Sequence, residues 1–388
     1  MKFLHTADWQ LGKPFAGTED PNKRALLQNE RFNVIRRIGG IIQEHQAEFV
    51  LVAGDLFDSP TVTKPNVAAA CSAIGALKVP VYVIPGNHDH GGPGSLWDQE
   101  FFKREWQELA PNLNILLKSE PVILPNAVLF PCPLMRRHEP EDPTQWLRSS
   151  QDFSGQFGDR ARIVIAHGSV INFGSFADDD ESDGGANNLL ELSRLTEADF
   201  DYIALGDWHG AKQVGPKSWY SGTPELDRFV KGGDHNPGNV LMVNAARGNL
   251  PNVQVVHSGA FDWHEVVFNF PDDLSLDQLK QQLDEKIGTD ANSDLLRLQL
   301  TGSLGIEASA RLTRLIESWS ARLLRVKLDN QTIIAPSASE LDGLKSRPSD
   351  PLVSRVAGKL EVMAKGSDEQ AAIARVALRE LYIQCNPR

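Results

Sequence analysis

The chain has 388 residues, of which 41% are hydrophobic and 23% charged, and its formal net charge is −12 at pH 7. This length allows a large catalytic domain and a smaller second domain. The acidic balance argues against a protein that coats nucleic acid by bulk electrostatics, but it allows an enzyme whose bound metal ions supply local positive charge. The apolar runs are too short to span a membrane and the three cysteines are scattered, so we expect a cytoplasmic protein with reduced thiols.

Apolar runs and helical spacing alternate through the first half of the chain. Five runs predict buried strands at residues 3–7, 49–52, 81–84, 163–166 and 202–205. Helices are predicted at about residues 32–42, 65–77 and 97–109, and a hairpin at 122–130. This alternation predicts parallel strands and an α/β fold. A second, largely antiparallel sheet layer is expected from shorter strands at 219–220, 240–244 and 253–256.

The composition changes near residues 258–259. Beyond this point, three strands and two helices predict a compact α+β module. A linker with Ser and Pro is expected at 336–350, and two helices close the chain. The predicted domains are residues 1–260, residues 261–335 and residues 336–388. Within the first domain, the acidic, glycine-rich run 173–185 is predicted to be a solvated loop.

Each of the five buried strands leads into a side chain of a metal-binding type. Open α/β sheets place ligand sites at the carboxyl ends of their strands, so these side chains are expected to converge. The candidates are Asp8, Asp55, Asn87, His167, Asp207 and His209. Asp55 is the expected bridge between two ions, because one carboxylate can touch both. The mixture of oxygen and nitrogen donors without a thiolate favours Mn²⁺.

A pair of such ions would activate water and hold a phosphoryl group in place. His88 follows Asn87 directly, and it is the candidate to protonate the leaving oxygen.

These residues lie in five motifs that resemble those of the calcineurin-like metallophosphoesterases: Asp8-x-Gln10, Gly54-Asp55-x-x-Asp58, Gly86-Asn87-His88-Asp89, His167 and Gly206-Asp207-x-His209. The segments 5–12, 55–58 and 220–225 are similar to the SbcD branch of DNA-repair exonucleases. The resemblance implies a layered α/β/β/α sandwich with a smaller α+β cap domain and C-terminal helices. It also implies DNA and an SbcC-like coiled-coil ATPase subunit as partners, and a homodimer as a further expectation.

The resemblance also implies two ligand sets, with His88 as the catalytic histidine. One ion would be held by Asp8, Gln10, Asp55 and His209, and the other by Asp55, Asn87, His167 and Asp207. The family usually has histidine at the positions of Gln10 and Asp207. Glutamine is a weaker, neutral ligand and the aspartate adds negative charge, so we expect an active enzyme with a high demand for metal.

Several other polar and aromatic residues have a structural interpretation. His5 lies in a predicted strand and is expected to be a packed core histidine. Trp9 and Trp208 stand beside predicted ligands, and core packing is the expectation for both. Lys212 and Arg228 are expected to be solvated charges, with phosphate contact as the minority interpretation.

The function predicted from these observations is metal-dependent cleavage of DNA by an exonuclease acting in DNA repair, through a two-metal-activated hydroxide. Two alternatives stay open. One is a phosphodiesterase or phosphatase for a small phosphoester. The other is a catalytically weakened scaffold for an ATPase partner, which the unusual Gln10 and Asp207 would explain.

Overall fold

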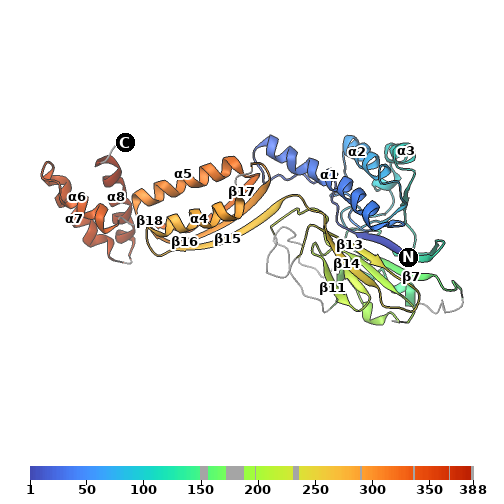
Figure 1. The fold of residues 1–388 in the computed structure, drawn as a ribbon. Coiled ribbons are helices and arrows are strands. Elements are labelled where there is room, and N and C mark those ends of the chain that lie inside the picture. The colour runs from blue at the N-terminus through green and yellow to red at the C-terminus, as the bar shows by residue number, and fades with distance from the viewer. Residues whose placement is uncertain are drawn as a thin grey trace. The chain divides into compact units, whose positions relative to one another are not determined.

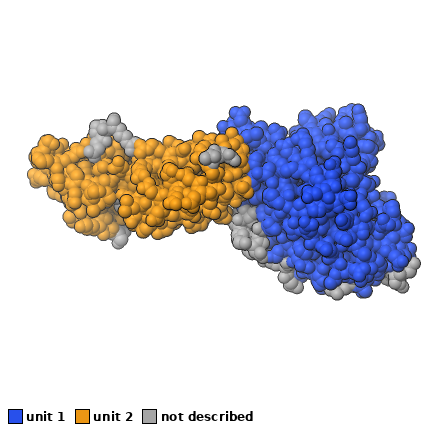
Figure 2. All heavy atoms as spheres, viewed as in Figure 1, with its two compact units in different colours: residues 1–261 blue, residues 262–388 orange. Residues whose placement is uncertain are grey.

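The computed structural model describes all residues except 149–155, 172–187, 197, 230–235, 289–290, 335–336, 367 and 386–388. The acidic run 173–185 therefore lies outside the described residues. The chain divides into unit 1, residues 1–261, and unit 2, residues 262–388 (Figures 1 and 2). Among the described residues, no helix combines the length and the apolar character needed to cross a membrane.

Unit 1 is built on two six-stranded sheets. The first has the strand order β14 (Asn252–His257), β13 (Asn239–Asn244), β1 (Lys2–Thr6), β2 (Val50–Ala53), β3 (Val81–Ile84) and β4 (Leu113–Ile115). The second has the order β11 (Lys212–Gly215), β12 (Ser218–Tyr220), β10 (Tyr202–Gly206), β7 (Ala161–His167), β6 (Ala127–Cys132) and β5 (Val122–Ile123). A two-stranded sheet of β8 (Ser169–Val170) and β9 (Leu189–Leu190) follows β7.

The central strands of both large sheets are parallel. The five predicted buried strands correspond to β1, β2, β3, β7 and β10, and the predicted hairpin is the antiparallel pair β5 and β6. The prediction of a separate antiparallel layer is wrong. The antiparallel pair β13 and β14 extends the first sheet beside β1, and β12 joins the second sheet in parallel with β10. Strand patterning indicates a strand but does not identify its pairing partner.

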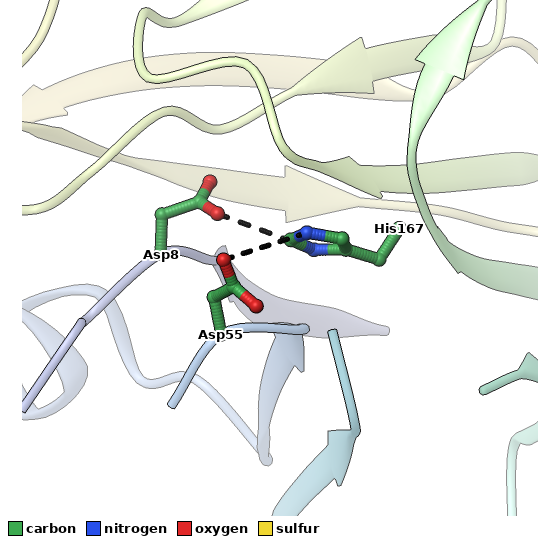
Figure 3. A group of neighbouring side chains, drawn as sticks. All are labelled: Asp8, Asp55 and His167. Carbon is green, nitrogen blue, oxygen red and sulfur yellow. Dashed lines mark ion pairs between the residues drawn. The ribbon is translucent and has the colours of Figure 1, made fainter. Parts of the chain in front are cut away.

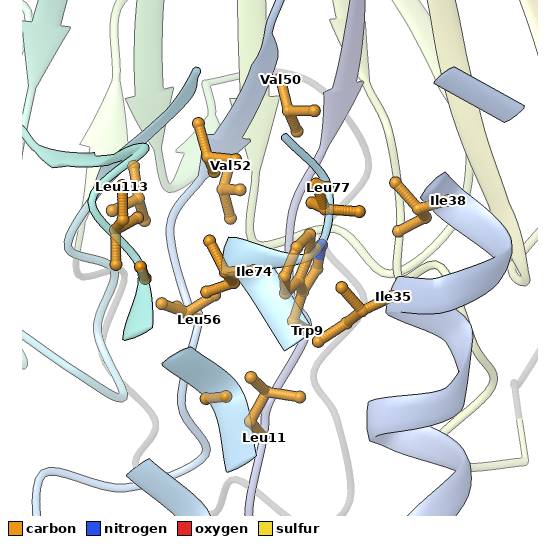
Figure 4. Close-up of a cluster of buried hydrophobic side chains, with 14 of the residues drawn as sticks. Trp9, Leu11, Ile35, Ile38, Val50, Val52, Leu56, Ile74, Leu77 and Leu113 are labelled. Atoms are coloured by element: carbon orange, nitrogen blue, oxygen red, sulfur yellow. The ribbon is translucent and has the colours of Figure 1, made fainter. Parts of the chain in front are cut away.

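Side chains of the first sheet point alternately to its two faces. One face packs against helices, and the other packs against the second sheet. On β2, Val50 and Val52 pack toward the helices, whereas Leu51 and Ala53 pack between the two sheets. The helical layer consists of α1 (Pro21–His45), α2 (Lys64–Gly75) and α3 (Glu100–Leu109), with a 3₁₀ turn η1 (Leu96–Asp98) before α3. Figure 4 shows the core between this layer and the first sheet. A strand that is buried on both faces is apolar throughout, which explains the continuous run in the sequence.

The outer face of the second sheet has a different cover. In the part of the chain that the structure describes, the 3₁₀ helices η2 (Gln145–Arg148) and η4 (Leu192–Arg194) and their flanking loops pack on this face. Leu147, Phe157 and Leu195 from these segments contact the same core as Phe130 of β6. The layers are therefore helices, sheet, sheet, and an outer layer of 3₁₀ turns and loops.

Unit 2 begins with a module of alternating strands and helices. Its elements are β15 (Asp262–Phe270), α4 (Ser275–Ile287), β16 (Asp294–Leu304), α5 (Ile306–Arg322), β17 (Arg325–Asn330) and β18 (Ile333–Ile334). All strand pairs in it are parallel. Three helices follow: α6 (Ala338–Lys345), α7 (Pro351–Ala364) and α8 (Glu369–Cys385). The segment expected to be a linker thus contains α6, which begins with a capping box formed by Ser337 and Glu340.

Two glycines allow the sheets to approach each other at the ends of β2, β7 and β10. A Cβ atom on Gly54 would lie 2.1 Å from His167 Nδ1, and one on Gly206 would lie 1.9 Å from the carbonyl oxygen of Ala53. Gly54 also has a φ of +94°, which side chains other than glycine rarely adopt. Side chains at the ends of these strands are therefore brought within contact distance of one another.

Replacing Gly54 by alanine should reduce the free energy of unfolding by more than about 2 kcal/mol, because the methyl group clashes with a buried ring in addition to the strained backbone. Urea denaturation followed by tryptophan fluorescence measures this loss. Gly248→Ala is the matched control, since Gly248 has a φ of +76° and no atom within 4 Å of the added Cβ. The control should lose only about 1 kcal/mol. Equal losses in the two variants would contradict the close approach of the sheets.

Candidate metal centre

The predicted ligands from both sheets meet at the carboxyl ends of the strands. Asp8 follows β1, Asp55 follows β2, and His167 ends β7. Donor atoms of these three buried residues all lie within 4.8 Å of one another, and Figure 3 shows the two carboxylates facing the imidazole ring. The expected convergence of distant strand ends is thus present in the structure.

His167 presents one ring nitrogen to a group of oxygen atoms. Its Nδ1 lies 2.8 Å from the carbonyl oxygen of Ala53, which can only accept, so Nδ1 carries the proton. The Nε2 atom lies 2.9 Å from Asn87 Oδ1, 3.6 Å from Asp55 Oδ2 and 3.8 Å from Asp207 Oδ1. A backbone carbonyl that fixes the tautomer in this way leaves Nε2 as the ligand atom.

Burial and neighbouring charges shift the pKa values of the ionisable residues in this group. Asp8 is fully buried and Asp55 is 2% exposed. Burial raises the pKa of Asp8 to about 6, despite the opposing effect of the nearby histidines. Burial lowers the pKa of His167, but the carboxylates of Asp55 and Asp8 outweigh burial and raise it to about 9. Buried carboxylates that face each other require a cation, either a protonated histidine or a bound metal ion.

The backbone of the ligand loops is also unusual. Asp8, Gln10, Asp55 and Asp207 have φ angles of 53°, 44°, 54° and 99°. Positive φ is uncommon for residues other than glycine and is held only where the surroundings fix it. The backbone N–H of Asp207 donates to both carboxylate oxygens of Asp8, at 3.2 and 3.3 Å, and Ser169 Oγ donates to Asp207 Oδ2 at 2.8 Å. These bonds fix the position of Asp207 at the edge of the group.

His88 lies beside Asp55 on the solvent side. Its backbone N–H donates to Asp55 Oδ1 at 2.9 Å, and its Nδ1 lies 2.7 Å from the carbonyl oxygen of Asp58. Its Nε2 lies 4.0 Å from Asp55 Oδ2, and the side chain is 20% exposed. The ring is therefore held by its Nδ1–H, and Nε2 is the atom that can exchange a proton with a bound molecule.

Gln10 and His209 form a second group beside the three-residue cluster, and His209 is close enough to Asp8 to act against the rise in its pKa. Gln10 Nε2 lies 3.5 Å from His209 Nε2. Lys13 Nζ donates to Gln10 Oε1 at 2.8 Å, and Arg228 Nη2 lies 3.1 Å from His209 Nε2. Asp227 accepts a hydrogen bond from His209 Nδ1 at 3.0 Å and pairs with Lys13 Nζ at 3.0 Å.

Sequence reasoning missed Lys13 and Asp227. The expectation that Arg228 is a solvated charge is wrong, because it pairs with Asp227 at 3.2 Å and its side chain is only 21% exposed. Burial lowers its pKa below the usual arginine value. The one available signal for Lys13 was its place three residues after a predicted ligand, in the turn closed by the bond from its N–H to the Gln10 carbonyl.

His5 and Trp9 both lie in the core of unit 1. His5 is a packed core histidine, with Nδ1 2.9 Å from Tyr202 Oη and Nε2 3.2 Å from the Leu205 carbonyl. Trp9 is fully buried and donates from Nε1 to Thr6 Oγ1 at 2.9 Å. The predictions that His5 and Trp9 pack in the core are confirmed.

The donor set beside His167 fits a divalent cation. It combines carboxylate oxygens of Asp8, Asp55 and Asp207 with the amide oxygen of Asn87 and an imidazole nitrogen, which suits a first-row transition ion. Such a set, at the strand ends of a two-sheet sandwich, defines a metal-dependent phosphoesterase. Residues 1–237 match the family model described as calcineurin-like phosphoesterase, so the chain belongs to this family. The motif resemblance is thereby confirmed, and with it hydrolysis of phosphoester bonds.

Individual relatives are more distant. The chain is 23% identical over 222 residues to the SbcD subunit of the nuclease SbcCD from Staphylococcus epidermidis, and the match covers 54% of this chain and 57% of that protein. A solved crystal structure shares 15% identity with a TM-score of 0.39, and the structure of TT1561 of Thermus thermophilus shares 11% with a TM-score of 0.38. Each covers 66% of this chain and 98% of the other chain.

Asp89, the last residue of the Gly-Asn-His-Asp motif, joins the two loops that carry Asp55 and Asn87. Its Oδ1 accepts from the N–H of Gly86 at 2.8 Å, and its Oδ2 accepts from the N–H of Phe57 at 3.1 Å. The carboxylate is 1% exposed, so both bonds form away from water. The motif alone gave no role for this residue.

Asp89→Asn should lower the free energy of unfolding by about 1–3 kcal/mol, because an amide accepts only one of the two bonds and turns its NH₂ toward the other donor. It should also weaken Mn²⁺ binding, since both ligand loops lose their fixed position. Urea denaturation and calorimetric Mn²⁺ titration measure the two effects. Asp98→Asn is the control, because Asp98 accepts from the N–H of Gly94 at 3.0 Å at an exposed site. Unchanged metal affinity in Asp89→Asn would contradict the positioning role.

Proposed function

We propose that this chain is a DNA exonuclease that acts in DNA repair and uses divalent metal, preferably Mn²⁺. The observation that carries the proposal is the position of His88 Nε2 at the exposed edge of a buried donor group, 4.0 Å from Asp55 Oδ2. A proton donor at this position can reach the leaving oxygen of a phosphodiester that approaches from solvent. The phosphoryl oxygens of such a substrate would face the metal ligands. The distant likeness to a protein named as a nuclease subunit supports DNA as the substrate.

A bound divalent ion would polarise the phosphoryl oxygens and lower the pKa of water. The chain's own residues provide the rest. Asp8, Asp55 and His167 form the buried floor, and the partly exposed Asn87 and Asp207 complete the ligand set toward solvent.

His88 donates its Nδ1 proton to the Asp58 carbonyl, which keeps Nε2 directed to the leaving oxygen. When the ring is protonated, Nε2–H can be transferred to that oxygen as the bond to phosphorus breaks.

The terminal helices support the proposal of a partner subunit. Their exposed apolar residues include Leu352 (71%), Val362 (70%), Ile373 (62%) and Val376 (58%). These side chains lie on α7 and α8, and they are apolar anchors of the kind that a partner helix can cover. We propose docking of an SbcC-like coiled-coil ATPase there, in keeping with a relative that is named as a subunit. The capping role of residues 261–335, the homodimer and the cytoplasmic location stay predictions.

His88→Ala should lower kcat for cleavage of end-labelled DNA in Mn²⁺ by about 10²–10⁴-fold, the usual contribution of a positioned acid. Metal affinity should change little, because His88 lies outside the ligand group. His257→Ala is the control, since His257 is exposed on β14.

Parallel assays with bis(p-nitrophenyl) phosphate separate the alternatives. Turnover of this small ester with intact DNA would indicate a small-substrate phosphodiesterase. Absence of both activities in wild type would indicate the scaffold.

A further inference from the structure

We propose that Lys13 and Arg228 replace one of the two metal ions that the motif resemblance implies, so that the centre binds a single divalent ion beside His167. The proposal concerns the ion that Gln10 and His209 were expected to hold. It refines the proposed metal-dependent function, because the site is the same and only its cations differ. Its basis is that a cationic side chain already lies against each expected ligand: Lys13 donates to the amide oxygen of Gln10, and the guanidinium of Arg228 lies against the ring of His209.

The first of these atoms is Gln10 Oε1. Lys13 Nζ lies 2.8 Å from it, and an ammonium group can only donate, so the amide oxygen faces Lys13. The amide nitrogen then faces His209 Nε2, at 3.5 Å. A metal ion on Oε1 would have to lie close to a fixed positive charge. Lysine cannot turn away easily, because it also contacts Asp58 Oδ1 at 3.3 Å and Asp227 Oδ2 at 3.0 Å.

The second atom is Nε2 of His209. The Nδ1 of this ring lies 3.0 Å from Asp227 Oδ1, which places the ring proton on Nδ1 and leaves a lone pair on Nε2. Arg228 Nη2 lies 3.1 Å from this Nε2. The same Nη2 lies 3.3 Å from Nδ1, almost as close as it is to Nε2, so the guanidinium lies against the imidazole ring and its positive charge disfavours a second cation at Nε2. The arginine is anchored by its own pair with Asp227.

Asp227 is the residue that makes this arrangement stable. It is buried, and it contacts the lysine, the arginine and the histidine at 3.0, 3.2 and 3.0 Å. A carboxylate with three donors around it keeps both cations in place and leaves no buried charge unpaired among these four side chains.

The ligand group beside His167 presents oxygen atoms to the free nitrogen of its histidine. Oxygen atoms of Asn87, Asp55 and Asp207 lie within 4 Å of His167 Nε2. Carboxylates that face one another there attract a cation, whereas the region of Gln10 and His209 already contains two. The side chains of Lys13 and Arg228 are 20% and 21% exposed, so each can also contact a phosphate oxygen of the substrate.

The test is the number of Mn²⁺ ions bound by the full chain after chelator treatment. Isothermal titration calorimetry and metal analysis after gel filtration give the stoichiometry, and electron paramagnetic resonance separates an isolated Mn²⁺ from a spin-coupled pair. Wild type should bind one ion with an uncoupled spectrum. The triple variant Gln10→His, Lys13→Met and Arg228→Met, which removes both cations, should bind a second ion and give a coupled spectrum. Lys118→Met, an exposed lysine far from any ligand in sequence, should behave as wild type.

Two ions in wild type, or none, would overturn the proposal. A single ion in both wild type and the folded triple variant would also overturn it, because Lys13 and Arg228 would then not be what excludes the second ion. Circular dichroism establishes whether the triple variant is folded, and the wild-type stoichiometry decides the question if it is not. DNA cleavage is measured on the same samples: an inactive protein that binds one ion would refute the proposed nuclease function and leave this inference standing.

Discussion

The hydrogen bond from His167 Nδ1 to the carbonyl oxygen of Ala53 is the contact on which the site depends. It joins the end of β7 in the second sheet to the end of β2 in the first. It requires two sheets to lie closer than side chains normally allow, which is why Gly54 and Gly206 stand at this point. The same bond places the ring proton on Nδ1 and thus directs Nε2 at the carboxylates. One inter-sheet bond therefore determines both the tertiary arrangement and the chemistry of the ligand group.

Charged side chains that are buried away from water need hydrogen bonds that fix the surrounding main chain. Arg31 of α1 is buried, and its guanidinium donates to the carbonyl oxygens of Asp8, Trp9 and Glu225 and to Thr223 Oγ1. It thereby joins the loop after β1 to the loop that contains Asp227. Loss of such a cation would leave several carbonyl groups without donors. The strained backbone of Asp8 is tolerated because its neighbours on both sides are fixed in this way.

The sequence predicts the members of the ligand group better than their surroundings. Asp8, Asp55 and His167 follow apolar runs, and parallel strands deliver their ends to one edge, so convergence follows from local patterning. The partners of β13 and β12 could not be deduced, because pairing depends on contacts between segments far apart in the chain. Asp227 and Arg31 were missed for the same reason: the first acts on Lys13, and the second on Glu225, across about two hundred residues. Spacing along the chain cannot predict such contacts. Helix α6 was not predicted, because the Ser and Pro residues around it are typical of a linker.

The balance of charge explains how an acidic protein can act on an anionic phosphoester. The formal charge of −12 repels nucleic acid at a distance, so attraction has to arise within a few ångströms of the site. Lys13 and Arg228 are held there by Asp227, and their side chains are partly exposed. Unlike a metal ion, a fixed ammonium or guanidinium stays in place when the divalent metal is removed. Part of the attraction for phosphate is consequently built into the polypeptide, and binding of a phosphate group and binding of metal become separable properties of one centre.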